Sequence, residues 1–546
     1  KGLESGFYKR AIYIMSSYRN ISSAVVSSVR ELLLDGAEVV VKGRLTKELI
    51  GKKTRLAQPL ERYLFVPRRN NDIVAQFAES MWVLAGKNDI GWLSKYLPRA
   101  PLFSDDGNTW RGAYGPRLRR WGNIDQIDAV RKILLADRAS RQAVMTLFDP
   151  AVDYEPSKDI PCNNWLGWII REDRLHMSVA LRSSDVWWGF SGANAFEWSI
   201  LHEMLAYWVN AEVGQADYLA MSFHIYSDYF ERGGQMVTDF HGLSPYDFGI
   251  GRAPFATPWE ECQLKLERWF ELEAKISAQP EAPLGSFGQV GDPLLDSGLT
   301  LLHVAQAHNS WGEERLAYEL AQLPAHDYVA ALYERYSTKY PDLLKAVPQQ
   351  PIADFFAASS RRNTNIVSDF KVALKKLHVE KDRAYGGAWK KRGELVSIQP
   401  NIARKVDRLD TLLMTGMGLA GETELDTAVD LLVYVEKYRL FLAETLPPGV
   451  LLSANAPIPL SSHEQNFDTL IDRLELKLST RPLAEIIEDV KNAFDACWHG
   501  AESHAVPQER LVLATSLSEY SIELLSLLIH SNRQALTTFL QSAAVV

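Results

Sequence analysis

The sequence feature that most limits the possible folds of this chain is a change of hydrophobic periodicity near residue 280. The stretch SAQPEAPLGSFGQVGDP (277–293) is rich in Pro, Gly, Ser and Gln, as linkers and loops are. Before it, alternating runs such as LHMSVALRSSD mix with long apolar helical patterns such as AFEWSILHEMLAYWVNAEVG. After it, amphipathic helical patterns follow one another. The sequence therefore predicts an α+β domain at 1–276, a linker at 277–299 and an all-α domain at 300–546.

The size and charge of the chain narrow its possible functions. A chain of 546 residues exceeds what one hydrophobic core usually supports, which agrees with more than one domain. Its net charge of −9 argues against direct binding of duplex nucleic acid, because phosphate neutralisation requires a basic face.

The spacing of the cysteines and the hydropathy of the chain indicate the cellular compartment of the protein. Cys162, Cys262 and Cys497 lie far apart without a CxxC pair, which argues against a disulfide framework or a zinc site. No run approaches the roughly 20 apolar residues that cross a bilayer, and no signal-like stretch opens the sequence. We therefore expect a cytoplasmic protein without membrane association.

One of these cysteines has an unusual setting. Cys162 follows a proline and precedes two asparagines in KDIPCNNWLGW (158–168). A free cysteine is most often a buried, inert residue, whereas a catalytic thiol needs a neighbouring cation and groups that hold the electrophile. The residues that follow decide between these interpretations.

Polar residues with suitable chemistry follow Cys162 at short intervals. The stretch LRSSDVWWGFSGAN supplies Arg182, Asp185 and Asn194. His224 and Tyr226 in MSFHIYSDY share one strand face at a spacing of two. Taken singly, such residues are most often surface ion pairs or core histidines. Their order and spacing together favour a functional site.

In these motifs the chain resembles the thymidylate synthase family over roughly residues 40–235. The matching segments occur in the family's order: ESMWVLAGKNDIGWL, YGPRLRRWGNIDQI, SRQAV, PCNN, RSSD, GFSGAN and HIY. The resemblance implies an α+β fold in which a mixed sheet packs with helices. It also implies that a thiolate adds to C6 of a pyrimidine, so that C5 can attack a one-carbon unit carried by 5,10-methylenetetrahydrofolate.

The resemblance assigns roles to individual residues. Cys162 would be the nucleophile, and the further catalytic residues would be Glu79, Tyr114 and Asp185. The implied substrate-binding residues are Arg44, Arg141, Arg182, Ser183, Asn194, His224 and Tyr226. An asparagine amide can donate to O4 and accept from N3–H, so uracil is the expected base and dUMP the expected substrate. Arg182 would bind phosphate and also lower the pKa of the nucleophile.

Several positions depart from the family pattern. Gln142 follows Arg141 where the family has a second arginine that reaches the partner's phosphate in a homodimer. Asn163 stands where the family usually has histidine, and one extra residue separates Asp185 from Asn194. No short apolar tail near residue 275 closes the folate site. Because an open site admits water, the product could be 5-hydroxymethyl rather than 5-methyl.

The second half contains charged rows at helical spacing. Its basic row is Arg404, Lys405 and Arg408, and its acidic row is Glu422, Asp426 and Asp430. The rows could be a solvated, mutually paired face, or a site where Asp426 and Asp430 hold Mg²⁺ and the basic row holds phosphate. Residues 370–445 weakly resemble nucleotide-modification-associated, MazG-like all-α domains. This resemblance implies a nucleotide-binding or pyrophosphohydrolase-like domain.

Two classes of function remain open. The first is an enzyme that transfers a methyl or hydroxymethyl unit to C5 of a uracil nucleotide, acting as a homodimer. The second is a non-catalytic nucleotide sensor or scaffold on the same fold. Cys162 and Glu79 favour the enzyme, because a binding protein needs neither a nucleophile nor a base.

Overall fold

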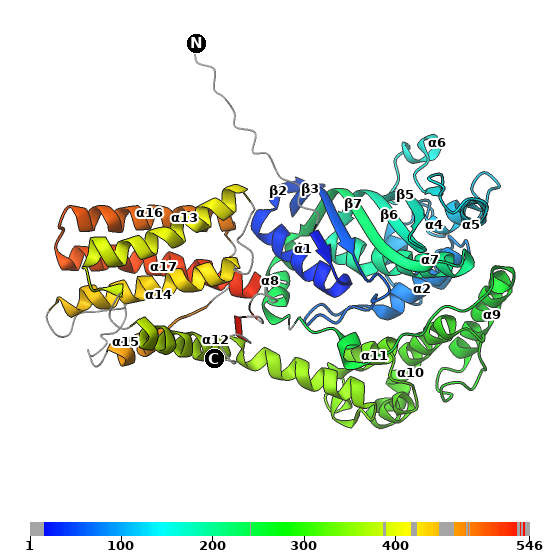
Figure 1. The fold of residues 1–546 in the computed structure, drawn as a ribbon. Coiled ribbons are helices and arrows are strands. Elements are labelled where there is room, and N and C mark those ends of the chain that lie inside the picture. The colour runs from blue at the N-terminus through cyan, green and yellow to red at the C-terminus, as the bar shows by residue number, and fades with distance from the viewer. Residues whose placement is uncertain are drawn as a thin grey trace, which may run out of the picture. The chain divides into compact units, whose positions relative to one another are not determined.

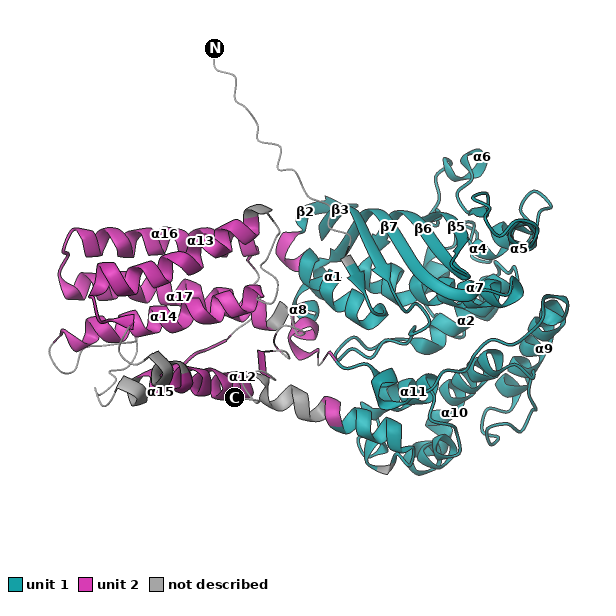
Figure 2. Ribbon diagram, viewed as in Figure 1, with its two compact units in different colours: residues 1–32, 36–233, 243–357 teal, residues 33–35, 234–242, 358–546 magenta. Residues whose placement is uncertain are grey.

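The computed structural model describes residues 16–240, 242–385, 389–415, 423–446, 463–476, 479, 481–531, 536 and 539–540. The chain divides into two compact units, which Figure 2 colours separately. Unit 1 comprises Lys1–Leu32, Gly36–Gly233 and Leu243–Ala357, and unit 2 comprises Leu33–Asp35, Gly234–Gly242 and Ala358–Val546.

Unit 1 is built on a seven-stranded mixed sheet (Figure 1). Its strands are β1 (Ser16–Tyr18), β2 (Ala37–Val41), β3 (Arg44–Leu56), β4 (Val144–Thr146), β5 (Asn163–Arg171), β6 (Arg174–Asp185) and β7 (Glu212–Tyr226). The order is β1-β3-β7-β6-β5-β4, and β2 pairs with β3. Strands β6 and β7 are parallel, whereas β5 and β6 form an antiparallel pair. This register brings the ends of β6 and β7 and the start of β5 to one region.

Helices precede, separate and follow these strands along the chain up to residue 385. They are α1 (Ile21–Asp35), α2 (Ile73–Leu84), α3 (Ile90–Leu93), α4 (Tyr114–Arg119), α5 (Gln126–Ala136), α6 (Pro150–Asp153), α7 (Ala195–Trp208), α8 (Phe230–Asp239), α9 (Trp259–Ala278), α10 (Pro293–Ala321), α11 (Asp327–Ser337) and α12 (Gln350–Tyr385). Most of α8 and of α12 belongs to unit 2. Asp72 caps α2 by accepting from the Ala75 amide at 3.2 Å. Helices α2 and α7 pack together beneath the sheet (Figure 1). The predicted α+β fold of the first half is confirmed.

The compact unit extends past the predicted linker. Helix α10 packs against α2 and α9, and the Trp269 indole N–H donates to the Leu295 carbonyl at 2.9 Å. A Cβ on Gly298 would lie 2.0 Å from the Phe77 ring, so only glycine allows this close approach. Unit 1 therefore ends at Ala357, whereas the sequence placed the boundary at 277–299.

Unit 2 is mostly helical, as the sequence predicts for the second half. Its further helices are α13 (Gln399–Thr415), α14 (Glu424–Glu444), α15 (His463–Asp472), α16 (Leu483–Glu502) and α17 (Pro507–Ser531). Residues 507–529 of α17 are long and apolar enough to cross a membrane, but 56% of the apolar window is buried inside the protein. Helix α17 packs on α14 and α16, as the core helix of a bundle does.

Candidate active site

The predicted nucleophile lies beside the predicted cation. Cys162 directly precedes β5, and the Arg182 Nη2 atom lies 3.5 Å from its sulfur. Arg182 also donates to the carbonyls of Ile160 and Pro161, at 2.8 and 2.9 Å. Its backbone N–H donates to the Cys162 carbonyl at 2.9 Å. The guanidinium therefore holds the nucleophile loop and supplies positive charge at the thiol.

Burial and charge act on the Cys162 thiol in opposite directions. Burial raises its pKa, Arg182 lowers the pKa, and Asp159 raises it further. The balance is a pKa above the ordinary value. Arg182 therefore does not by itself produce a thiolate in this state, contrary to the simple expectation from the sequence.

A network of hydrogen bonds holds Asn163, the residue that follows Cys162. Asn163 donates to the Tyr114 hydroxyl from its side chain at 2.6 Å and from its backbone at 3.3 Å. Its side-chain oxygen accepts from the Trp198 indole at 3.1 Å. The Trp198 and Tyr114 rings are also in contact, with centroids 5.3 Å apart. Asn163, which replaces the family's usual histidine, thus connects α4, β5 and α7.

The predicted catalytic glutamate occupies a desolvated position on α2. Burial raises the pKa of Glu79 to about 7, and the charge of Asp159 adds to the shift. A carboxyl group with a pKa near neutrality can both donate and accept a proton at physiological pH.

The extra residue between Asp185 and Asn194 is accommodated in a π-helix, η2 (Val186–Asn194). Asp185 caps it by accepting from the backbone N–H groups of Trp187 and Trp188, both at 3.0 Å. A π-helix contains one more residue per turn than an α-helix does, and such turns are frequent at functional sites. Asn194, which is buried, therefore reaches the start of α7 despite the added residue.

Other predicted substrate-binding residues lie at the ends of β3, β6 and β7. Asp185 pairs in register with His224, and Ser183 with Ser222. Burial raises the pKa of Asp185 and lowers that of His224. His224 and Tyr226 are adjacent, with ring centroids 5.3 Å apart.

Two predicted arginines lie near the surface. Arg44 is half-exposed, pairs with Asp228 at 2.6 Å and lies over the Tyr226 ring at 3.9 Å. Arg141 is exposed in the loop before β4. Its role toward a second subunit stays a prediction.

Comparison with known proteins identifies this part of the chain. The sequence model of the thymidylate synthase family matches residues 29–242. This segment is therefore similar to the thymidylate synthase family. A "Deoxyuridylate hydroxymethyltransferase" of Bacillus phage SP01 is 32% identical over 256 residues, which are 45% of this chain and 64% of the phage protein.

Two further relatives carry the same or a related name. A protein of the same name from Pseudomonas phage M6 is 32% identical over 41% of this chain and 65% of its own length. A candidate thymidylate synthase of Methanothermobacter marburgensis is 28% identical over 40% of this chain and 96% of its own length. The chain thus spans slightly less than two thirds of the phage relatives, and the matches concern the thymidylate synthase segment.

The charged rows of unit 2 do not support the predicted Mg²⁺ site. Asp426 forms a capping box with Thr423. Its carboxylate accepts hydrogen bonds from the Thr423 N–H and hydroxyl, both at 2.8 Å. Asp430 forms an ion pair with Lys405 at 2.7 Å. Glu422 lies outside the described residues, and these contain no cluster of metal-ligating side chains. The paired-face interpretation fits the contacts better.

The basic row also has partners: Lys405 pairs with Asp430 of α14, and Arg404 binds groups on its own helix. Arg404 donates to Asn401 and to the Pro400 carbonyl. Arg408, on the same helix α13, is also not a free cation. A nucleotide-handling role for this bundle stays a prediction.

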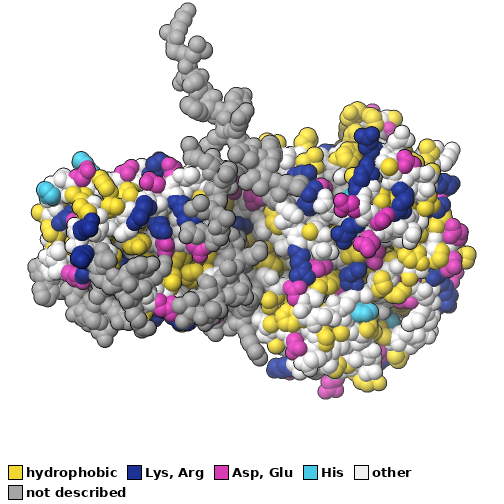
Figure 3. Space-filling model, viewed as in Figure 1, with side chains coloured by type: hydrophobic (Ala, Val, Ile, Leu, Met, Phe, Trp, Pro, Cys, Tyr) yellow, Lys and Arg dark blue, Asp and Glu magenta, His cyan; other side chains and the backbone are white. Residues whose placement is uncertain are grey.

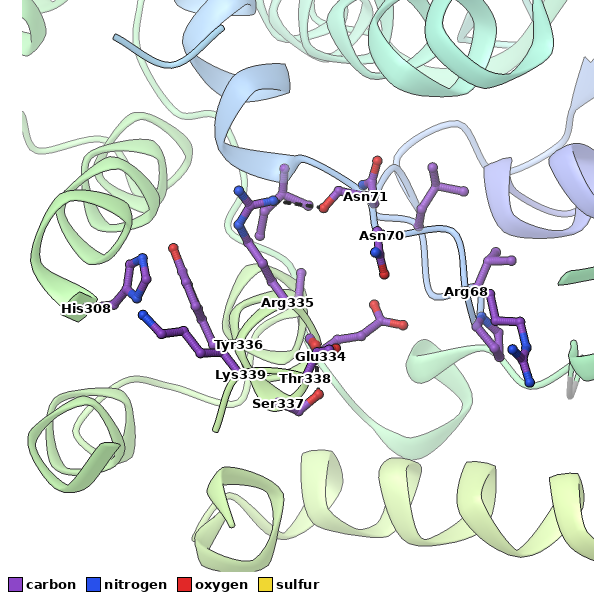
Figure 4. Close-up of a pocket in the computed structure, with 15 residues that line it drawn as sticks. Arg68, Asn70, Asn71, His308, Glu334, Arg335, Tyr336, Ser337, Thr338 and Lys339 are labelled. Atoms are coloured by element: carbon purple, nitrogen blue, oxygen red, sulfur yellow. Dashed lines mark hydrogen bonds between the residues drawn. The ribbon is translucent and has the colours of Figure 1, made fainter. Parts of the chain in front are cut away.

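A separate cavity of about 510 Å³ lies elsewhere in unit 1 (Figure 4). Its polar lining includes His308, Glu334, Arg335 and Lys339. Arg335 is already bound to the Asn71 carbonyl at 3.1 Å. None of the residues predicted for the thymidylate synthase site lines this cavity.

Two structural supports of the thymidylate synthase site escaped sequence reasoning. Arg117 binds Asp153 through two hydrogen bonds of 2.6 and 2.8 Å, and both side chains are almost fully buried. Arg117 also donates to the Leu147 carbonyl at 2.6 Å, which anchors the chain leading to Cys162. The second support is Glu197, which lies inside the apolar run AFEWSILHEML. A charged residue within such a run is unusual, and this could have marked Glu197 in the sequence.

Proposed function

We propose that the thymidylate synthase segment transfers a one-carbon unit to C5 of a uracil nucleotide, with dUMP as substrate. The Cys162–Arg182 pair carries this proposal, because a sensor needs a phosphate-binding arginine but not a thiol against it. The names of the phage relatives favour hydroxymethyl as the group transferred.

The residues divide the chemistry among them. The Cys162 thiolate would form a bond to C6, and the electrons of the C5–C6 double bond would move toward C5 and O4. Glu79 would transfer protons at O4. Tyr114 would assist the removal of the proton from C5. C5 would bond to the methylene carbon while the two bonds from that carbon to folate nitrogens break, and hydroxide from water would add to the same carbon. Expulsion of the Cys162 sulfur from C6 would then restore the double bond. Burial raises the pKa of the Cys162 thiol and the charge of Arg182 lowers it, so the guanidinium favours the thiolate form that attacks C6.

The surroundings of Asp185 fit a folate. The Trp188 indole is 48% exposed, and the Arg99 guanidinium lies 5.6 Å from its ring centre. An exposed aromatic face beside a cation suits flat rings joined to carboxylates. Methylenetetrahydrofolate would supply the one-carbon unit, and Trp188 and Arg99 would hold it.

We expect incubation with dUMP, tetrahydrofolate and formaldehyde to convert dUMP into 5-hydroxymethyl-dUMP. Mass spectrometry would identify the product, because hydroxymethyl and methyl additions differ by one oxygen atom. A 5-methyl product would correct the group transferred. Unchanged dUMP, with nucleotide binding intact, would favour the sensor.

We also propose that this segment forms a homodimer through the open face of its sheet. Trp165, Ala180 and Leu219 are direct neighbours in register and therefore share that face. The face carries large, exposed apolar side chains: Val144 (48%), Trp165 (40%), Ile169 (39%), Leu219 (49%) and Met221 (65%). Contiguous apolar surface of this kind is typical of a protein interface.

Leu219→Arg should weaken self-association by roughly 100-fold or more, because a charge buried in an interface without a partner costs several kcal/mol. Light scattering and sedimentation over a concentration series would measure this. Leu264→Arg is the matched control, since Leu264 is 67% exposed on α9, away from the sheet. A monomeric wild-type protein at micromolar concentration would contradict the proposed dimer.

The free thiols support a cytoplasmic location. On the face of unit 1 in Figure 3, Lys and Arg side chains are interspersed with Asp and Glu. Cys162, Cys262 and Cys497 are all free thiols, which suits a reducing compartment.

A further inference from the structure

Glu197 on α7 is a buried carboxyl group that takes no part in the chemistry proposed above. Its exposed fraction is 3%, and neither carboxyl oxygen has a well-formed hydrogen bond among the described residues. The Tyr218 hydroxyl of β7 is also buried without a hydrogen-bond partner among them. A buried carboxyl left in this way is costly, which indicates a function or an added partner at the site.

The surroundings of Glu197 belong to the candidate active site. Helix α2 packs on α7 near this point, where the Phe77 and Phe196 ring centroids are 6.1 Å apart. Glu79 lies two positions after Phe77 on α2, and the charge of Glu197 adds to the effect of burial in raising the pKa of Tyr114 on α4 and of Tyr218 on β7. Burial raises the pKa of Glu197 well above its ordinary value, and the charge of Glu79 raises it further. Ionisation of either carboxyl group therefore disfavours ionisation of the other.

Asn194 lies one helical turn before Glu197 and has a definite orientation. Its side-chain oxygen lies 3.9 Å from the point where a Gly189 Cβ would stand. Its amide approaches the Glu197 carboxyl, an interaction that lowers the pKa of Glu197 although its geometry is imperfect. The oxygen and nitrogen of this amide therefore face different surroundings.

We propose that Glu197 is a positioning residue that selects the pyrimidine by fixing the amide of Asn194. The Glu197 O–H donates to Glu79, and its C=O accepts one N–H of Asn194. The second N–H and the oxygen of Asn194 then match O4 and N3–H of uracil. Cytosine presents the reverse pattern and is rejected. This inference rests on the proposed function, because it concerns the same nucleotide site.

The test compares dUMP with dCMP in binding to the full-length protein, measured by equilibrium dialysis without folate. We expect Glu197→Met to reduce the preference for dUMP by roughly 10-fold or more, because Asn194 loses its acceptor. Glu197→Gln should retain the preference, since its carbonyl accepts from Asn194 and its amide donates to Glu79. Ile200→Met, at a buried position of α7, controls for repacking.

The outcomes separate the two proposals. If the wild type binds dUMP and Glu197→Met keeps the wild-type preference, the role of Glu197 is overturned while the proposed function stands. If the wild type binds no dUMP, the proposed function fails and this inference with it.

A second measurement requires no nucleotide. A carboxyl group whose folded-state pKa is raised stabilises the fold below its unfolded pKa, and that stability is lost as pH rises through the folded pKa. The melting temperature of the wild type should therefore fall more steeply from neutral toward alkaline pH than that of Glu197→Gln. Parallel curves would show that Glu197 holds no proton in the folded protein and would overturn the proposal.

Discussion

Cys162→Ser is expected to reduce tritium release from C5 of labelled dUMP by roughly 10³-fold or more, the scale seen when an enzyme loses its nucleophile. A serine hydroxyl ionises far less readily than a thiol, so no adduct at C6 forms to loosen the C5–H bond. Nucleotide affinity should change little, because Arg182, Asn194 and His224 remain. Tritium release and equilibrium dialysis measure the two effects separately.

Cys262→Ala is the matched control for this substitution. Cys262 is buried on α9, and burial raises the pKa of its thiol to about 12, so it is inert at neutral pH. The control should release tritium at the wild-type rate. Release by Cys162→Ser at that rate would refute the thiolate mechanism.

Arg117→Met is expected to lower the free energy of unfolding by about 3–5 kcal/mol, the usual cost of leaving one charge of a buried pair without its partner. The substitution retains most of the side-chain volume but leaves Asp153 facing a buried space. Because Arg117 also binds the Leu147 carbonyl, the chain before Cys162 should loosen as well. Urea unfolding monitored by tryptophan fluorescence would give the free energy.

The double variant Arg117→Met/Asp153→Asn tests the cause of that loss. Removing the second charge should recover part of the stability, because no isolated carboxylate remains. A loss of about 1 kcal/mol or less in Arg117→Met would place this pair with ordinary surface ion pairs. It would contradict the anchoring role of Arg117.

The fold and most of the candidate site could be predicted because their signals are local and ordered. Alternating apolar residues before Arg182 and the spacing of His224 and Tyr226 predicted strands there, and the register of β6 and β7 brings the two segments together. Cys162 and Arg182 are in contact, as their spacing suggested. The position of Glu197 beside Glu79 could not be predicted, because it depends on how α2 packs against α7.

Other differences have equally specific causes. The Asp426 spacing suggested a metal ligand, but the same residue three positions after Thr423 also forms a capping box, which needs no ion. The Pro- and Gly-rich stretch suggested a domain boundary, yet it is a loop between α9 and α10. The Gly298–Phe77 contact that joins α10 to α2 involves residues more than two hundred positions apart, beyond the reach of local patterns.

The π-helix after Asp185 allows related sequences to differ in length between Asp185 and Asn194. A widened turn confines a length change to itself, so Asp185 at one end and Asn194 at the other remain where the strand and helix need them. A related sequence can therefore gain or lose one residue here without moving the amide of Asn194. Alignments that count residues from Asp185 will misplace Asn194 by one position, and only the start of α7 marks it correctly.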